Sequence, residues 1–135
     1  MAEPKTQPTS ETLASFLKRI EDTQRRADCK AVAGMMATIT KAKAVVMSTG
    51  IVGFGTYEMT YAGGKTGSWP ALAFAPRKSD LTVYLSKTVM ADSALMAALG
   101  KATQKGGCLH IKQLADVNLE VLHTLMTRTY TSKTS

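Results

Sequence analysis

The sequence is poor in cysteine and has no long apolar run, and each shortage excludes a class of protein. Its two cysteines, Cys29 and Cys108, are too few for a disulfide framework, and they form no Cys-x-x-Cys pair. No stretch approaches the roughly 18 apolar residues of a membrane span. The N-terminal stretch also lacks the apolar segment of a signal peptide. We therefore expect a cytoplasmic protein without a membrane partner.

Acidic side chains are also scarce, because 17 lysines and arginines face only 10 aspartates and glutamates, which gives a net charge of +7. The excess is spread along the 135 residues and forms no basic arm or block. Spread positive charge attracts anions weakly, whereas a nucleic-acid surface is normally a stripe or a cluster. The sequence therefore argues against nucleic acid as the main partner, and it leaves a homo-oligomer open.

Apolar residues at helical spacing predict two helices near the N-terminus. Ser10 and Asp22 are of the residue types that cap such helices. Residues 1–9 contain two prolines and no apolar period, so they are predicted to be a disordered lead-in. The predicted core faces are Leu13, Phe16, Leu17 and Ile20 in the first helix, and Cys29, Val32, Met36 and Ile39 in the second.

From Ala44 onward the apolar period changes to two, which is typical of strands. The alternating runs are short and turn residues separate them, so we predict an antiparallel β-meander of four to five strands. A short helix is expected to end at Gly100, and residues 116–128 are amphipathic. The sequence thus predicts a single α+β domain over residues 10–130, followed by a disordered tail at 131–135. Its two N-terminal helices and its C-terminal helix would pack on one face of the sheet.

Two glycine-containing stretches imitate phosphate-binding loops, namely Gly53-Phe54-Gly55 and Gly64-Lys65-Thr66. A Walker A loop needs a glycine at the position that Met59 occupies, and a dinucleotide fingerprint needs one where Glu58 stands. Both motifs therefore fail. We predict instead that these glycines serve turns or bulges at strand ends, and that the second stretch turns a strand back into a hairpin.

Aromatic and basic residues gather along the predicted meander and suggest a ligand site. Aromatic walls with a few cations suit a small anionic or polar molecule. The alternative is that the aromatic rings belong to the core and that the cations are solvated. The candidate ligand-binding residues are Tyr57, Tyr61, Trp69, Arg77, Lys78 and Lys101.

Three further residues could form a metal site. By strand alternation, Glu58 lies opposite the face of its aromatic neighbours, and Cys108 and His110 lie opposite their apolar neighbours. If the two strands were adjacent, a carboxylate, a thiol and an imidazole would converge on the outer face of the sheet. That ligand set suits a transition metal. An ordinary solvated sheet face is the alternative.

The chain resembles the YdhG-like family, whose members are domains of unknown function. The similarity covers residues 10–128. It rests on six motifs: Gly53-Phe54-Gly55, Trp69, Pro76-Arg77-Lys78, Leu99-Gly100-Lys101, Cys108-Leu109 and Asp116-Val117. The resemblance implies a compact α+β domain. One branch of the family has been linked to frataxin-like intracellular iron delivery, so the resemblance also brings iron in as the alternative ligand and cofactor.

The sequence therefore predicts a non-catalytic binding protein for a small anionic or polar ligand, with an iron-binding protein as the alternative. An enzyme is a third hypothesis, in which Cys108 would be the nucleophile and Arg77 and Lys78 would stabilise charge. A reactive cysteine needs an accessible, electropositive setting and usually a base. The sequence shows neither, so it does not decide whether the protein is an enzyme.

Overall fold

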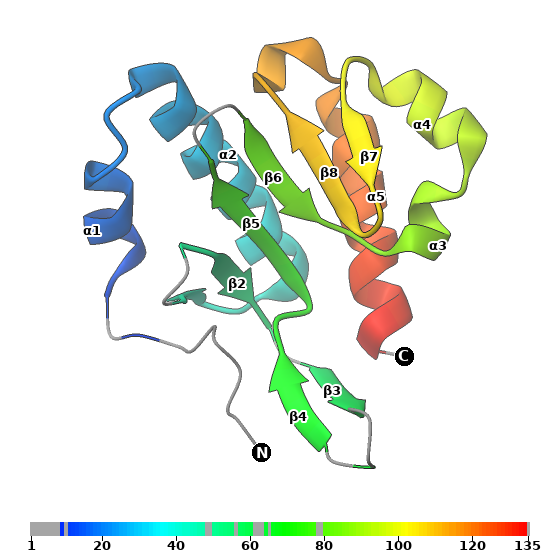
Figure 1. Cartoon of the computed structure of the whole chain (residues 1–135), viewed down its shortest axis with the longest axis horizontal. Coiled ribbons are helices and arrows are strands. Elements are labelled where there is room, and N and C mark those ends of the chain that lie inside the picture. The colour runs from blue at the N-terminus through cyan, green and yellow to red at the C-terminus, as the bar shows by residue number, and fades with distance from the viewer. Residues whose placement is uncertain are drawn as a thin grey trace.

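The computed structural model describes residues 9, 11–47, 50–55, 57–60, 64, 66–77 and 80–134. For residues 57–60, 66–69 and 133–134 only the backbone is considered. These residues form an α+β domain in which helices cover one face of an antiparallel sheet (Figure 1).

The main sheet has six strands in the order β1-β2-β5-β6-β8-β7, and every neighbouring pair is antiparallel. A separate pair, β3-β4, projects from one end of this sheet (Figure 1). The strands of the main sheet are β1 (Ala44–Val46), β2 (Val52–Phe54), β5 (Leu72–Pro76), β6 (Leu81–Tyr84), β7 (Thr103–Lys105) and β8 (Cys108–Ile111). The hairpin consists of β3 (Tyr57–Thr60) and β4 (Thr66–Trp69).

The helices come before, between and after these strands in the chain. At the start of several helices, a polar side chain accepts hydrogen bonds from the first backbone N–H groups. Asp22 accepts the Arg25 N–H at the start of the second helix, as predicted, and Asn118 accepts the N–H groups of Glu120 and Val121 at the start of the last. The helices are α1 (Leu13–Lys18), α2 (Thr23–Thr40), α3 (Lys87–Met90), α4 (Ser93–Leu99) and α5 (Leu119–Thr134), with a 3₁₀ turn, η1, at Leu114–Asp116.

The core lies between α2, α5 and the sheet face that they cover, which we call the inner face. Phe54 and Phe74 stack there with their ring centroids 6.5 Å apart. Met36 of α2 and Leu122 and Met126 of α5 are completely buried against the same layer. The predicted packing of the N-terminal and C-terminal helices on one face is therefore confirmed.

The sheet differs from the predicted meander in two ways: it has six strands rather than four to five, and the chain leaves it between β2 and β5 to form a separate hairpin. β7 was not predicted, because its three residues are all exposed and carry no apolar alternation; only its pairing with β8 makes it a strand. The chain also leaves the main sheet after β2. Gly55, with φ +69°, turns it into β3, so β3 does not continue β2 within one strand.

The ends of two helices also differ from the prediction. Thr12 caps α1 by accepting the Ser15 N–H, and the predicted cap Ser10 lies outside the described residues, as does the predicted lead-in before Thr9. α5 continues to Thr134, so the segment from 131 to 134 is helical rather than a disordered tail. No glycine or proline interrupts the chain there, and buried Thr129 accepts the Ser86 N–H and anchors this last part.

Candidate functional site

The candidate site lies on the outer face of the sheet, which is the face opposite α2 and α5. Strand register sets two rows of side chains across this face. One row runs from Ala75 through Thr82 and His110 to Thr103. The next row runs from Ala73 through Tyr84 and Cys108 to Lys105. Each row is apolar over β5 and becomes polar toward β8 and β7.

The apolar end of the outer face is a small second cluster. Met47 and Ile51, from the connection between β1 and β2, lie buried with Ala73 and Ala75, and Tyr84 packs beside them. The polar end is different, because Thr103 and Lys105 are exposed and Cys108 and His110 are half-buried. The ligand-accessible part of this face is therefore its polar end, over β6, β8 and β7.

Three side chains meet in a triangle at the centre of the polar end. The Nδ1 atom of His110 lies 3.3 Å from Oδ1 of Asp80 and 3.3 Å from Oγ1 of Thr82, and Thr82 donates to the same Asp80 oxygen at 3.2 Å. A carboxylate only accepts hydrogen bonds, so Nδ1 carries the hydrogen in this contact. Among the described residues, none forms a hydrogen bond with the Nε2 atom of His110, which remains available to a ligand.

Asp80 is held in place by α2. The Arg25 guanidinium donates to the carbonyl oxygens of Arg77 and Asp80, and the Arg77 N–H donates to the same Asp80 carbonyl at 2.8 Å. These bonds fix both ends of the connection between β5 and β6. A rigid support of this kind keeps the carboxylate and the imidazole oriented without a bound ligand.

Two hollows lie on either side of the His110–Thr103 pair. The first has a volume of about 350 Å³ and is lined by Lys101, Ala102, Thr103, His110, Lys112 and Asp116. The second has a volume of about 220 Å³ and is lined by Asp80, Thr103, Lys105 and His110. The first lies at the low end of the range for small-molecule sites and the second lies below it, so they suit a compact ligand.

Positive charge exceeds negative charge around these hollows. Lys101, Lys105 and Lys112 contribute three cations, against the carboxylates of Asp80 and Asp116. Asp80 is already engaged by His110 and Thr82, whereas no ion pair engages any of the three lysines within the described residues. Ammonium groups in this setting can bind the oxygens of a carboxylate or a phosphate.

Gly100 determines where Lys101 lies. The glycine has φ +110°, and a Cβ atom there would come within 2.6 Å of the Asp116 carbonyl oxygen. This close approach lets the Lys101 N–H donate to that oxygen at 3.1 Å, which joins the end of α4 to the η1 turn. The Gly100-Lys101 pair therefore serves backbone geometry as well as charge.

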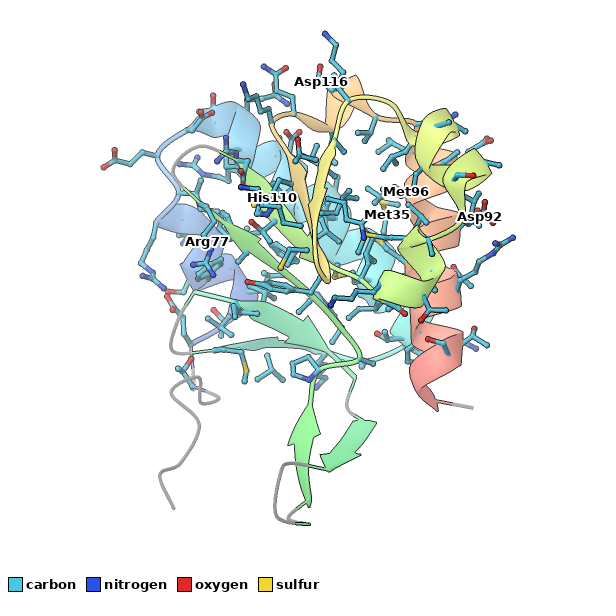
Figure 2. The ribbon with its side chains drawn as sticks, turned by 45° about the vertical axis from the view of Figure 1, so that its right-hand side comes forward. Met35, Arg77, Asp92, Met96, His110 and Asp116 are labelled. Carbon is cyan, nitrogen blue, oxygen red and sulfur yellow. The ribbon has the colours of Figure 1, made fainter. Side chains whose placement is uncertain are left out.

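The structure brings some of the predicted residues together. Lys101, predicted as a ligand-binding residue, shares a hollow with His110, predicted as a metal ligand. Arg77 donates to the Tyr84 hydroxyl at 3.3 Å, on the same outer face, but it does not line either hollow. Figure 2 shows Arg77 and His110 over this face of the sheet, with Asp116 near its far end.

Other predicted residues lie elsewhere. Tyr57 and Trp69 pair with each other in the β3-β4 hairpin, and Glu58 pairs with Ser68 there. The predicted meeting of Glu58 with Cys108 and His110 required β3 to lie beside β8, and the two strands belong to different sheets. Tyr61 and Lys78 lie outside the described residues.

A metal site receives no support from the described side chains. Cys108 and His110 share the outer face, as alternation predicted. Within the described part of the chain, however, no three histidine, cysteine, aspartate or glutamate side chains are close enough to hold an ion.

The candidate residues predicted from the sequence left out Asp80, Thr103, Lys105 and Lys112. Lys112 lies two residues from His110, so strand alternation already indicated its face. Lys105 lies across the β7–β8 turn from Cys108, so a correctly predicted β7 would have placed it beside the site. The position of Asp80 depends on the pairing of β6 with β8, which no local pattern specifies.

Comparison with known proteins adds no relative. No family model, curated protein or solved structure matches this chain. Among the helices that the structure describes, none combines the length and apolar character that crossing a bilayer requires.

Proposed function

We propose that the protein binds a small anionic ligand, bearing carboxylate or phosphate groups, in the two hollows beside His110. The observation that carries the proposal is the grouping of Lys101, Lys105 and Lys112 around one imidazole on a rigid sheet. Strand pairing fixes the backbone under His110 and Lys105, and the Asp116 contact fixes the backbone of Lys101. The backbone that carries Lys101 and Lys105 is therefore fixed before a ligand arrives, so binding has to order only their side chains.

The polar groups of the site suit an anion that also carries hydroxyl groups. His110 and Thr103 line both hollows. The Thr103 hydroxyl can donate a hydrogen bond to a ligand oxygen, and the Nε2 atom of His110, which carries no hydrogen when Nδ1 does, can accept one from a ligand hydroxyl. Asp116 at the rim gives the ligand's hydroxyl groups an acceptor. A hydroxylated carboxylate or a sugar phosphate matches this pattern better than an apolar molecule does.

The proposal is of binding rather than catalysis. A nucleophilic role for Cys108 would need a base in contact with its thiol. His110 is the nearest candidate by register, but no hydrogen bond joins the two side chains within the described contacts. Iron binding, the alternative that the family resemblance implied, has no observation that favours it over an anion.

A thermal-shift panel of citrate, pyrophosphate and glucose 6-phosphate tests the proposal. A ligand at ten times its Kd adds about 1.4 kcal/mol to the free energy of unfolding, which raises Tm by about 5 °C for a domain of this size. The strongest hit is then titrated by calorimetry. We expect Lys101→Ala with Lys112→Ala to weaken binding about tenfold, as the loss of two screened ionic contacts implies.

Two further variants provide the control. Lys30→Ala with Lys43→Ala changes the net charge equally, but neither lysine lines the hollows. This variant should bind the hit as the wild type does. Arg77→Ala should have a smaller effect than Lys101→Ala, because Arg77 contacts Tyr84 outside the hollows. Equal losses in the two double variants, or no hit in the panel, would reject the proposal.

A further inference from the structure

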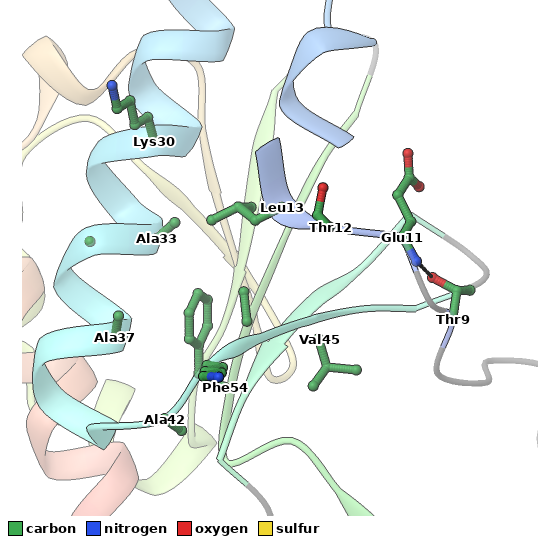
Figure 3. A pocket seen from close by; sticks show the side chains of 13 residues that line it. Thr9, Glu11, Thr12, Leu13, Lys30, Ala33, Ala37, Ala42, Val45 and Phe54 are labelled. Carbon is green, nitrogen blue, oxygen red and sulfur yellow. Dashed lines mark hydrogen bonds between the residues drawn. The ribbon is translucent and has the colours of Figure 1, made fainter. Parts of the chain in front are cut away.

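A groove at the other end of the molecule has a different chemistry. It has a volume of about 780 Å³ and lies between α1, α2 and the edge strand β1. Figure 3 shows Leu13 reaching from α1 toward Ala33 of α2, with Phe54 beside them. The apolar lining is formed by Leu13, Ala33, Gly34, Ala37, Ala42, Ala44, Val45 and Phe54.

The polar groups of this groove are mostly engaged already. The Thr9 hydroxyl donates to the Val46 carbonyl at 2.8 Å, and the Thr12 hydroxyl accepts the Ser15 N–H at 3.1 Å. Glu11 forms an ion pair with Arg19 at 2.6 Å. A polar ligand would therefore find few free partners along the walls, whereas an alkyl chain requires none.

Two cations complete the lining. Lys30 and Lys43 are exposed at the groove, and neither forms an ion pair or a hydrogen bond within the described residues. Since Glu11 is neutralised by Arg19, the uncompensated charge of the groove is positive. An apolar trough with ammonium groups at its edge is complementary to a molecule with one alkyl chain and one anionic end.

We propose that this groove binds an unbranched aliphatic carboxylate, with the alkyl chain against Leu13, Ala37 and Ala44 and the carboxylate at Lys30 or Lys43. The small side chains of α2 leave a shallow, smooth wall, which suits a methylene chain better than a branched or aromatic group. This site is separate from the hollows beside His110, and it does not depend on the function proposed for them.

Gly34 provides a sharp test, because it lines the groove and a Cβ atom there would meet nothing within 4 Å. Gly34→Leu fills the groove while improving helix propensity, so Tm should rise and lost binding cannot be attributed to unfolding. With decanoate as the probe, below its micelle concentration, calorimetry should show saturable binding to the wild type and none to Gly34→Leu. Ala37→Leu, at a half-buried lining position, is the second blocking variant.

The anionic end is tested by exchanging decanoate for decanol. Wild type should bind decanol about fivefold more weakly, as the loss of one screened ionic contact implies. Lys30→Ala with Lys43→Ala should weaken decanoate binding by a similar factor and leave decanol binding unchanged. The control variant, Lys101→Ala with Lys112→Ala, should bind decanoate normally. Unchanged decanoate binding in both folded blocking variants, equal binding of the two probes to the wild type, or no binding at all would overturn the proposal.

Discussion

The imidazole of His110 and the carboxylate of Asp80 are 30 positions apart in the sequence, yet their Nδ1 and Oδ1 atoms lie 3.3 Å apart on the outer face of the sheet. Both side chains are about three-quarters buried, at 28% and 22% exposed. The contact orients the imidazole and places one negative charge beside the lysines. Asp80 therefore supports the geometry of the proposed anion site and opposes its charge.

Because the negative charge of Asp80 opposes that of the ligand, its removal should increase the affinity of the site for an anion. Asp80→Asn keeps the size of the side chain and an oxygen that accepts hydrogen bonds, but it removes the negative charge next to the smaller hollow. Binding of the anion identified in the panel should strengthen about twofold to fivefold, a range typical of one screened charge. Calorimetry measures it. Asp92→Asn is the matched control, because it changes the net charge equally and asparagine still caps α4.

Gly100→Ala should destabilise the protein and displace Lys101. The new methyl group would meet the Asp116 carbonyl oxygen at 2.6 Å in a backbone conformation with φ +110°. We expect a loss of about 2–3 kcal/mol in the free energy of unfolding, the usual cost of such strain. Urea denaturation measures it, and a wild-type midpoint would contradict the account of this loop.

Gly34→Ala is expected to have the opposite effect and to increase the free energy of unfolding. Gly34 lies inside α2 and its added methyl group enters open space. Because alanine favours a helix over glycine by about 0.5–1 kcal/mol, the same urea experiment should show a more stable protein. A destabilised Gly34→Ala variant would mean that this part of α2 does not border an open groove.

Asp28, which lies outside the proposed site, should contribute strongly to the stability of the fold. This carboxylate is 5% exposed, and it accepts the Leu114 N–H at 3.1 Å and the Gln24 amide at 2.8 Å, which ties α2 to the η1 turn. Asp28→Ala leaves the Leu114 N–H without its partner and should cost about 2–3 kcal/mol. Asp28→Asn retains an acceptor and should cost clearly less. Equal losses in thermal unfolding would show that the hydrogen bond is not the cause.

The two cysteines should react very differently. Burial raises the pKa of the Cys29 thiol to about 12, although nearby Arg25 opposes this shift, whereas Cys108 is half-buried. Iodoacetamide reacts with thiolates, so native protein at pH 8 should gain one label, at Cys108, and denatured protein should gain two. Mass spectrometry counts them. Native Cys108→Ser should remain unlabelled, and a label at Cys29 would contradict its burial.

The raised pKa of Cys29 also makes the stability of the fold depend on pH in the alkaline range. Below pH 9 the thiol is protonated in both states, so ionisation of Cys29 does not affect stability. Between pH 9 and about 12 the unfolded chain loses this proton and the folded chain keeps it, so stability falls. Cys29→Ala should show a shallower decline in the free energy of unfolding between pH 9 and 11 than wild type does. Parallel declines would contradict the shift.

Local patterns predicted most of the fold. Asp22 and Gly100 marked helix ends, and alternation placed Leu109 and Ile111, which are buried, on the face opposite Cys108 and His110. β7 could not be predicted, since Thr103, Gln104 and Lys105 have no apolar pattern and depend on β8 for pairing. The end of α5 was missed because the Ser86 N–H that the Thr129 hydroxyl accepts, and the core cluster against which Tyr130 packs, are formed by distant segments that no local pattern reveals.

The site was harder to predict than the fold. Alternation correctly placed Cys108 and His110 on one face, but it could not reveal that β3 leaves the main sheet at Gly55. Strand order is a non-local property, and it decides which polar side chains meet. For this reason His110 has Asp80 and Lys101 as neighbours, while β3, which carries Glu58, pairs with β4.

The most direct test of the proposed anion site is an amide NMR titration with citrate at low ionic strength. The account predicts saturable shifts that centre on Lys101, Thr103, Lys105, His110 and Lys112. It also predicts weaker binding at 0.15 M salt, where the screening length falls to about 8 Å. Shifts that grow without saturation, or that spread equally over Lys18, Lys30 and the other exposed lysines, would contradict a specific site beside His110.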